Sequence, residues 1–241
     1  MGSTWHKLIP ALHVRFEGLT SSFRHPLTIS GTQLSTPMPS YSTILGLISS
    51  CAGRIVRSRE TRIGFEFHCR SDGLELERTD RLMMDKKGHL EPQPKQGITR
   101  RQVYWYPRLD IYVTNLNLRS AFRNPAGTPC LGRSQDIAWI TFVKDVELRP
   151  IAKGALGPTL ISMPRIGVPG LVVRLPEWMN NERMRFAREA GPSGIYQAMI
   201  PTTERRFEIE ADGLYHPSDS ESDKDVIYLH EWIMNGKQDP R

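Results

Sequence analysis

The sequence predicts an α+β protein built on one antiparallel sheet, and three observations support this prediction. An alternating segment at 11–16 precedes one helical segment at 41–52, and more alternating segments follow at 63–77, 103–113 and 137–143. Alternation of apolar and polar residues indicates half-buried strands, whereas a longer apolar run behind a capping residue indicates a helix. One strand, one helix and then further strands are typical of a mixed domain with a single core.

The first two elements follow from local patterns. Apolar and polar residues alternate from Leu12 to Phe16, which is the period of a strand with one buried face. The helix is expected over about 41–52, because Ser40 or Ser42 can cap exposed amides at its start and Gly53 can end it.

The later strands complete a recognisable order. Ile63, Phe65 and Phe67 alternate with polar residues or glycine, and Asp72-Gly73 is a dipeptide typical of hairpin turns. Residues 103–113 are expected to form a strand kinked at Pro107, and 137–143 the next strand. Strand, helix, strand, strand, short helical piece, strand is the order of a ferredoxin-like or RNA-recognition-motif sheet.

Residues 80–102 interrupt that order with a long excursion between two strands. They contain almost no periodicity, two prolines, and six basic residues against three acidic ones; the basic residues are Arg81, Lys86, Lys87, Lys95, Arg100 and Arg101. Excursions of this length are usually functional or disordered, so a solvated loop is the alternative to a binding element.

The sheet domain is expected to occupy residues 1–150, followed by a smaller β-rich region at 151–241. In that region we expect a helix at 176–190 and strands near 205–210 and 225–230. The helix contains Arg183, Arg185 and Arg188, which are more typical of a solvated face than of a binding site.

Charge is unevenly distributed along the 241 residues, whose formal net charge is +6. Residues 1–130 contain 18 Lys and Arg against 10 Asp and Glu, whereas 131–241 contain 14 against 16. A basic half favours a polyanionic partner, because bound cations release the counterions condensed on a nucleic acid. An ordinary fluctuation of composition remains the alternative.

Metals, disulfides and membranes are not expected. The three cysteines are far apart and form no CxxC pair, so the sequence predicts no metal site, no cofactor and a reducing cytoplasm. No signal peptide is recognisable, and the apolar stretch Ile44–Ala52 is too short to span a bilayer.

Two clusters resemble a known family. One is Ser21-Ser22-Phe23-Arg24-His25-Pro26 followed by Thr36-Pro37-Met38-Pro39-Ser40-Tyr41-Ser42-Thr43-Ile44-Leu45-Gly46-Leu47-Ile48. The other is Leu131-Gly132-Arg133-Ser134-Gln135-Asp136-Ile137-Ala138. Together, over roughly residues 10–150, they resemble the CRISPR-associated Cas-five family of the RAMP superfamily, subunits of type I Cascade complexes.

The resemblance implies a non-catalytic, RNA-binding Cascade subunit of antiviral defence. Such a subunit binds the 5′ handle of the guide RNA, caps the complex, and contacts the backbone subunit, the large subunit and the target DNA. It also implies a thumb hairpin where 80–102 falls. Subtype I-B is favoured, because the residues with which one branch of the family cleaves precursor RNA are missing. The expected RNA-binding residues are Arg24, His25, Ser40, Tyr41, Ser42, Arg133 and Ser134, with thumb contacts from Arg81, Lys86, Lys87, Lys95, Arg100 and Arg101.

Each expected contact has a structural alternative. Tyr41 can stack a splayed base, or it can pack the helix start onto the sheet. Arg24 can reach a phosphate or pair with a neighbouring acid, and Arg133 can do the same or brace the core through Asp136.

Two other functions stay open. One branch of the family cleaves precursor RNA with a Tyr after the first helix and a Lys-His pair before the Gly-Arg segment. This chain has Cys51-Ala52 and Gly127-Thr128-Pro129 there, which leaves Lys87-Gly88-His89 as the remaining candidate for a metal-independent endoribonuclease. The third hypothesis is a general single-stranded RNA-binding module that uses the sheet.

Overall fold

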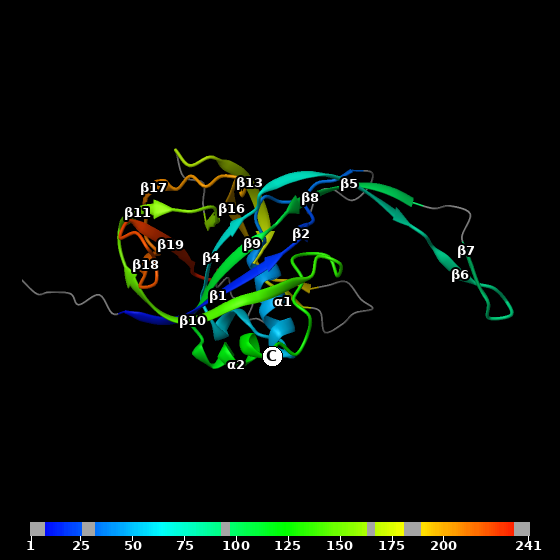
Figure 1. Cartoon of the computed structure of the whole chain (residues 1–241), viewed down its shortest axis with the longest axis horizontal. Coiled ribbons are helices and arrows are strands. Elements are labelled where there is room, and N and C mark those ends of the chain that lie inside the picture. The colour runs from blue at the N-terminus through cyan, green and yellow to red at the C-terminus, as the bar shows by residue number, and fades with distance from the viewer. Residues whose placement is uncertain (1–7, 26–31, 93–96, 163–166, 181–188, 234–241) are drawn as a thin grey trace, which may run out of the picture.

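The computed structural model describes residues 8–25, 32–92, 97–162, 167–180 and 189–233. Its body is a ring of strands with helix α1 packed on one side, and a long two-stranded arm leaves the body (Figure 1). No helix in these ranges is long and apolar enough to cross a membrane.

The ring contains six strands. Its sheet order is β18-β10-β1-β9-β4, and β19 closes it by pairing with both β18 and β4. The strands are β1 (Ile9–Gly18), β4 (Ile63–His68), β9 (Arg108–Val113), β10 (Ala138–Pro150), β18 (Leu214–Pro217) and β19 (Asp225–His230). Two further strands, β11 (Lys153–Leu156) and β17 (Phe207–Glu210), extend the sheet beyond β19.

This architecture corrects the α+β expectation toward a mostly β protein. The described residues contain only α1 (Tyr41–Ala52), the short α2 (Arg119–Arg123) and two 3-10 turns, η1 (Ser58–Glu60) and η2 (Leu116–Leu118). The expected boundary near 150 falls at the end of β10, and β18 and β19 from the C-terminal region supply two strands of the ring.

Helix α1 confirms the predicted helix and both of its ends. The Ser40 hydroxyl accepts a hydrogen bond from the Thr43 amide at 3.1 Å, and Gly53 follows the helix at φ 64°. A positive φ costs glycine nothing, which is why the chain turns there. The helix buries Ile44 and Ile48 against the same core as Leu12 and Phe65.

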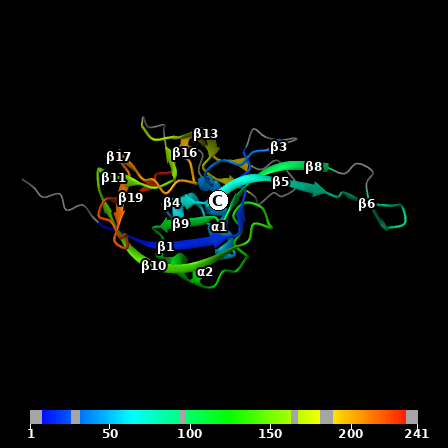
Figure 2. The same ribbon diagram turned by 45° about the horizontal axis from the view of Figure 1, so that its top comes forward.

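The arm is the part of the chain inserted between β4 and β9 (Figures 1 and 2). Strands β5 (Ser71–Thr79) and β8 (Gly97–Trp105) pair along their whole length, and β6 (Leu82–Met84) pairs with β7 (Leu90–Pro92) near the tip. Two short strands, β2 (Thr20–Ser21) and β3 (Thr32–Gln33), flank β8 where it leaves the body. We define the arm as residues 71–92 and 97–105.

Two sequence expectations at the base of the arm were wrong. Asp72-Gly73 is no turn, because both residues lie within β5 opposite Tyr104 and Val103. Residues 103–113 are also two strands instead of one, since the chain breaks at Tyr106, with φ 51°, and Pro107. The break separates β8, which belongs to the arm, from β9, which belongs to the ring.

The remaining strands form smaller sheets. β16 (Ser193–Met199) lies between β12 (Leu160–Ser162) and β13 (Gly170–Pro176), and β14 (Met179–Asn180) pairs with β15 (Glu189–Ala190). The predicted helix at 176–190 was therefore wrong at 176, 179–180 and 189–190, where strand pairing takes the place of helical turns. Residues 181–188, including Arg183, Arg185 and Arg188, lie outside the described residues. The strands expected near 205–210 and 225–230 are confirmed by β17 and β19.

Closure of the ring covers both faces of β1, β9 and β4, whereas β10 keeps several exposed residues. One face packs on α1, and the other encloses a second apolar cluster of Ala11, Tyr112, Val146, Leu148, Ile227 and Leu229. Gly64 permits this closure, because a Cβ there would lie 3.0 Å from both the Ile227 side chain and the Tyr228 carbonyl oxygen. Within the described residues, β1, β9 and β4 therefore lack the open face on which a sheet-type RNA-binding module holds its RNA.

Candidate functional site

The two sequence clusters meet at the base of the arm. The Ser22 amide donates to the Leu131 carbonyl at 3.1 Å, and the Thr20 hydroxyl donates to Asp136 Oδ1 at 2.7 Å. Gly132 lies at φ 120°, and a Cβ there would be only 2.1 Å from the Ser22 carbonyl oxygen. The glycine is thus required by the close approach of two backbone segments.

Arg133 is held at this junction by carboxylates. Its Nε and Nη2 donate to Asp136 at 2.9 and 2.8 Å, and its Nη1 donates to Glu75 of the arm at 3.0 Å. Only 12% of its side chain is exposed, and the hydrogen bonds with Asp136 raise its pKa. The structure therefore places Arg133 as a brace between the 131–136 loop and the arm, while the adjacent Ser134 is exposed.

Tyr41 lies in the core, which corrects its expected role in base stacking. Its hydroxyl donates to the Leu160 carbonyl at 2.7 Å, and its ring stacks on His230 with centroids 3.9 Å apart. Burial raises its pKa well above the ordinary value. With both the ring and the hydroxyl in use, Tyr41 anchors α1 to β12 and β19 and offers no free face to a base.

The remaining residues near the helix start differ in accessibility. Ser40 and Ser42 are half-buried and share a hydrogen bond of 2.8 Å between their hydroxyls. Arg24 is exposed, and its backbone bridges to Ser35; His25 is half-buried. Within the described ranges Arg24 forms no ion pair.

The arm carries four exposed cations that form no ion pair with any described residue: Arg81, Lys86, Lys87 and Arg100. Arg101 instead pairs with Glu77 at 2.6 Å. Lys95 lies outside the described residues. The acidic neighbours are largely engaged, since Asp80 pairs with Arg78 and Asp85 accepts two amide hydrogen bonds in the turn at the tip.

One face of the arm combines cations with apolar side chains. Across the β5–β8 pair, Leu76 lies opposite Arg100 and Arg78 opposite Ile98. Leu76 and Ile98 are 71% and 72% exposed. Exposed apolar residues of this size beside arginines suit a surface that becomes covered by a partner.

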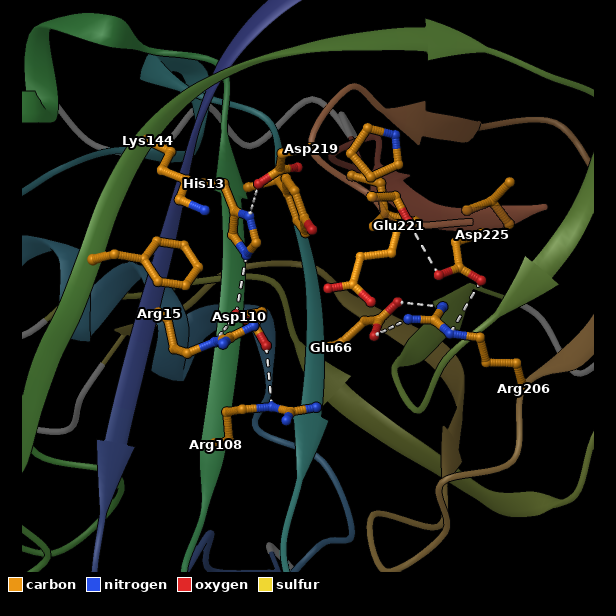
Figure 3. A pocket seen from close by; sticks show the side chains of 16 residues that line it. His13, Arg15, Glu66, Arg108, Asp110, Lys144, Arg206, Asp219, Glu221 and Asp225 are labelled. Atoms are coloured by element: carbon orange, nitrogen blue, oxygen red, sulfur yellow. Dashed lines mark hydrogen bonds and ion pairs between the residues drawn. The ribbon is translucent and has the colours of Figure 1, made fainter. Parts of the chain in front are cut away.

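A second feature, which the sequence reasoning missed, is a charged pocket of about 300 Å³ on the inner side of the ring (Figure 3). His13 of β1 lies between two aspartates, with Nε2 3.0 Å from Asp110 of β9 and Nδ1 2.6 Å from Asp219. Opposite them, Arg206 makes two hydrogen bonds to Glu66 at 2.8 and 2.9 Å. Asp219 follows β18, so this pair connects the ring-closing segment to β1.

The pKa shifts of this group reflect its pairing. Burial alone lowers the pKa of His13, but the hydrogen bonds and charges of Asp110 and Asp219 outweigh it and raise the pKa above 6.5. Burial raises the pKa of Asp110 and Asp219, but the hydrogen bonds with His13, joined at Asp110 by that with Arg15, outweigh it and lower the pKa of both below 3.8. The folded state therefore favours a charged His13 between two carboxylates.

These shifts predict how stability depends on pH. A raised pKa means that the His13 contribution is fully present below about pH 6.5 and is lost as pH rises through the folded value. We expect the free energy of unfolding in urea to fall over this range in the native protein and much less in His13→Gln. His89→Gln, at an exposed position on the arm, is the control and should keep the native slope; equal slopes in the native protein and His13→Gln would contradict the assignment.

The pocket was missed because its residues come from separate strands. The alternation at 11–16 places His13 and Arg15 on one face, and Arg108 with Asp110 repeats the pattern, but a polar strand face ordinarily indicates solvent. The signal that points to a pocket is that basic and acidic residues occur together on the corresponding faces of three strands, β1, β4 and β9.

A ring of strands with an inserted hairpin arm defines the structural class of this chain, and one solved structure is similar to it in overall fold. The chain aligns with one in a "CRISPR RNA-guided surveillance complex" at a TM-score of 0.52 and 12% identity, covering 83% of this chain and 91% of that one. A CRISPR protein from Archaeoglobus fulgidus aligns at a TM-score of 0.48 and 11% identity, over 92% of this chain and 100% of that one. No family model and no curated protein matches the sequence.

Proposed function

We propose that this chain is a non-catalytic, cytoplasmic subunit of a CRISPR RNA-guided effector complex, in which it binds the guide RNA. The observation that carries the proposal is the arm, which is inserted between β4 and β9. The chain that carries it is similar in fold to a member of such a complex. The order β10-β1-β9-β4, with helices after β1 and β9, is that of a ferredoxin-like sheet and supports a RAMP-type subunit.

The finer proposal is the Cas-five role, in subtype I-B. The subunit would bind the 5′ handle with Arg24, His25, Ser40, Ser42 and Ser134 at the base of the arm, and cap the complex. Arg133 and Tyr41 would support that surface from behind. The apolar face of the arm would be covered by the backbone subunit, the large subunit or the guide–target duplex.

The charges of the arm make this proposal testable by salt dependence. If Arg81, Lys86, Lys87 and Arg100 contact phosphates, log affinity for a repeat-derived 5′-handle RNA should fall against log salt with a slope of about −3, at roughly −0.7 per contact. Replacing all four by Gln should weaken binding and flatten the slope, as measured by fluorescence anisotropy.

A matched variant distinguishes the effect of the arm's own cations from the effect of total net charge. Arg149, Lys153, Arg174 and Lys224 are exposed cations outside the arm, and replacing them by Gln removes the same total charge. This control should keep most of the slope. Equal losses in both variants, or cleavage of the RNA at a discrete position that His89→Ala abolishes, would contradict a non-catalytic arm-based interface.

A further inference from the structure

The charged pocket on the inner side of the ring, here called the ring pocket, contains charged side chains that keep free donors or acceptors beside their ion pairs. Arg15 and Arg108 both contact Asp110 through Nε, at 2.7 and 3.4 Å. The terminal nitrogens of both guanidinium groups bond to no described residue, and the buried Nε of Arg108 has no hydrogen-bond partner there. Lys144 lines the same side, 4.7 Å from the Phe142 ring centre, and forms no ion pair in the described part of the chain.

The opposite wall offers acceptors. Asp219 Oδ1 is buried and accepts no hydrogen bond from any described residue, although Oδ2 is bonded to His13. Glu221 points into the pocket beside Glu66 (Figure 3), and its carboxylate has no partner within the described ranges. The pocket therefore presents free donors on the β1, β9 and β10 side and free acceptors on the other.

We propose that this pocket binds the phosphate monoester of a ribonucleotide. A phosphate would satisfy Arg15, Arg108 and Lys144, because guanidinium and ammonium groups form strong charge-assisted hydrogen bonds with phosphate oxygens. Hydroxyl or amino groups of the nucleoside would donate to Asp219 and Glu221. A volume of about 300 Å³ lies at the lower end of the usual range for ligand pockets and suits one nucleotide.

Both halves of the pocket are needed to recognise this ligand. Inorganic phosphate would leave the buried Asp219 oxygen without a donor, and an unphosphorylated nucleoside would leave the terminal nitrogens of Arg15 and Arg108 and the Lys144 ammonium without a phosphate. Unpaired buried polar groups carry the cost of their lost hydration, so each partial ligand should bind more weakly. The site lies inside the ring and does not depend on the proposed role of the arm.

Calorimetric titration of the full chain with 5′-AMP, adenosine and inorganic phosphate tests the inference. AMP should bind at least about tenfold more tightly than either partial ligand. Titrating an oligoribonucleotide that carries a 5′-phosphate, and the same oligoribonucleotide with a 5′-hydroxyl, shows whether the phosphate belongs to an RNA end or to a free nucleotide. Binding of the phosphorylated oligonucleotide as tight as that of AMP assigns the pocket to an RNA end, whereas exclusive binding of AMP assigns it to a free nucleotide.

Substitutions locate the binding to this pocket. Lys144→Gln and Arg108→Gln should each weaken AMP binding about tenfold, the order expected for losing one charge-assisted hydrogen bond, while Lys153→Gln leaves it unchanged. Lys144 is exposed, so its variant should fold normally, which circular dichroism checks. No detectable heat with AMP at millimolar concentration, or native affinity in both pocket variants, would overturn the proposal.

Discussion

Gly132→Ala is expected to lower the free energy of unfolding by about 3 kcal/mol or more. Two effects add at this position, since φ is 120° and the new Cβ would lie 2.1 Å from the Ser22 carbonyl oxygen and 2.8 Å from its carbon. Both contacts are with backbone, which cannot move aside as a flexible side chain can. Relief requires separating the 131–136 loop from the 20–22 segment, and with it the base of the arm from the body.

Urea unfolding measures this effect, and a second glycine provides a control of opposite sign. Gly46 lies in α1, is exposed, and a Cβ there meets nothing within 4 Å. Gly46→Ala should therefore stabilise the protein by about 0.5–1 kcal/mol, because alanine has the higher helix propensity. If Gly132→Ala unfolds at the native urea concentration, the two backbone segments are not in the contact described.

Asp136→Ala is expected to have the second large effect, lowering the free energy of unfolding by about 3–5 kcal/mol. Asp136 is fully buried and accepts hydrogen bonds from the Arg133 guanidinium, the Arg133 amide and the Thr20 hydroxyl. Its removal leaves Arg133, mostly buried, with the partly exposed Glu75 at 3.0 Å and Glu77 at 3.8 Å as its remaining partners among the described residues. A buried charge that loses its partner costs far more than the intact pair contributes.

An exposed pair of the same chemistry is the natural control. Asp145 pairs with Arg119 at the surface, where 57% of the Asp145 side chain is exposed. Asp145→Ala should change stability by no more than about 1 kcal/mol, since solvent screens such pairs. A further test is Arg133→Ala in the Asp136→Ala background, which should add little because both changes disrupt one network. Additive losses would show that the two residues act separately.

Much of the local structure could be predicted from the sequence. Helix α1 was expected over about 41–52, because a capping hydroxyl at Ser40 or Ser42, an apolar run and Gly53 are signals carried by neighbouring residues, and the structure has Ser40 as the cap. Strand β1 and the place of the insertion also followed from periodicity and its loss. The expected bounds of the insertion were too narrow, since the arm begins at Ser71, where alternation continues from β4 and conceals the point at which the chain leaves the ring.

The sites required contacts between distant parts of the chain. Tyr41 and Arg133 had both a binding role and a structural role open from the sequence, and the choice came from Leu160, His230 and Glu75, which are 119, 189 and 58 residues away. The same holds for the ring pocket, whose His13–Asp219 contact joins residues 206 apart.

Sequence alone thus determined the helix at 41–52, the strand at 11–16 and where charge accumulates, because these properties depend on neighbours along the chain. Only the tertiary structure decided which faces are covered. Pairing of β19 with β4 turned the polar face of an apparently open sheet into a pocket lined with opposite charges. A polar residue on a strand has the same local pattern whether water or a carboxylate from a distant segment satisfies it, so long-range pairing decides between the two.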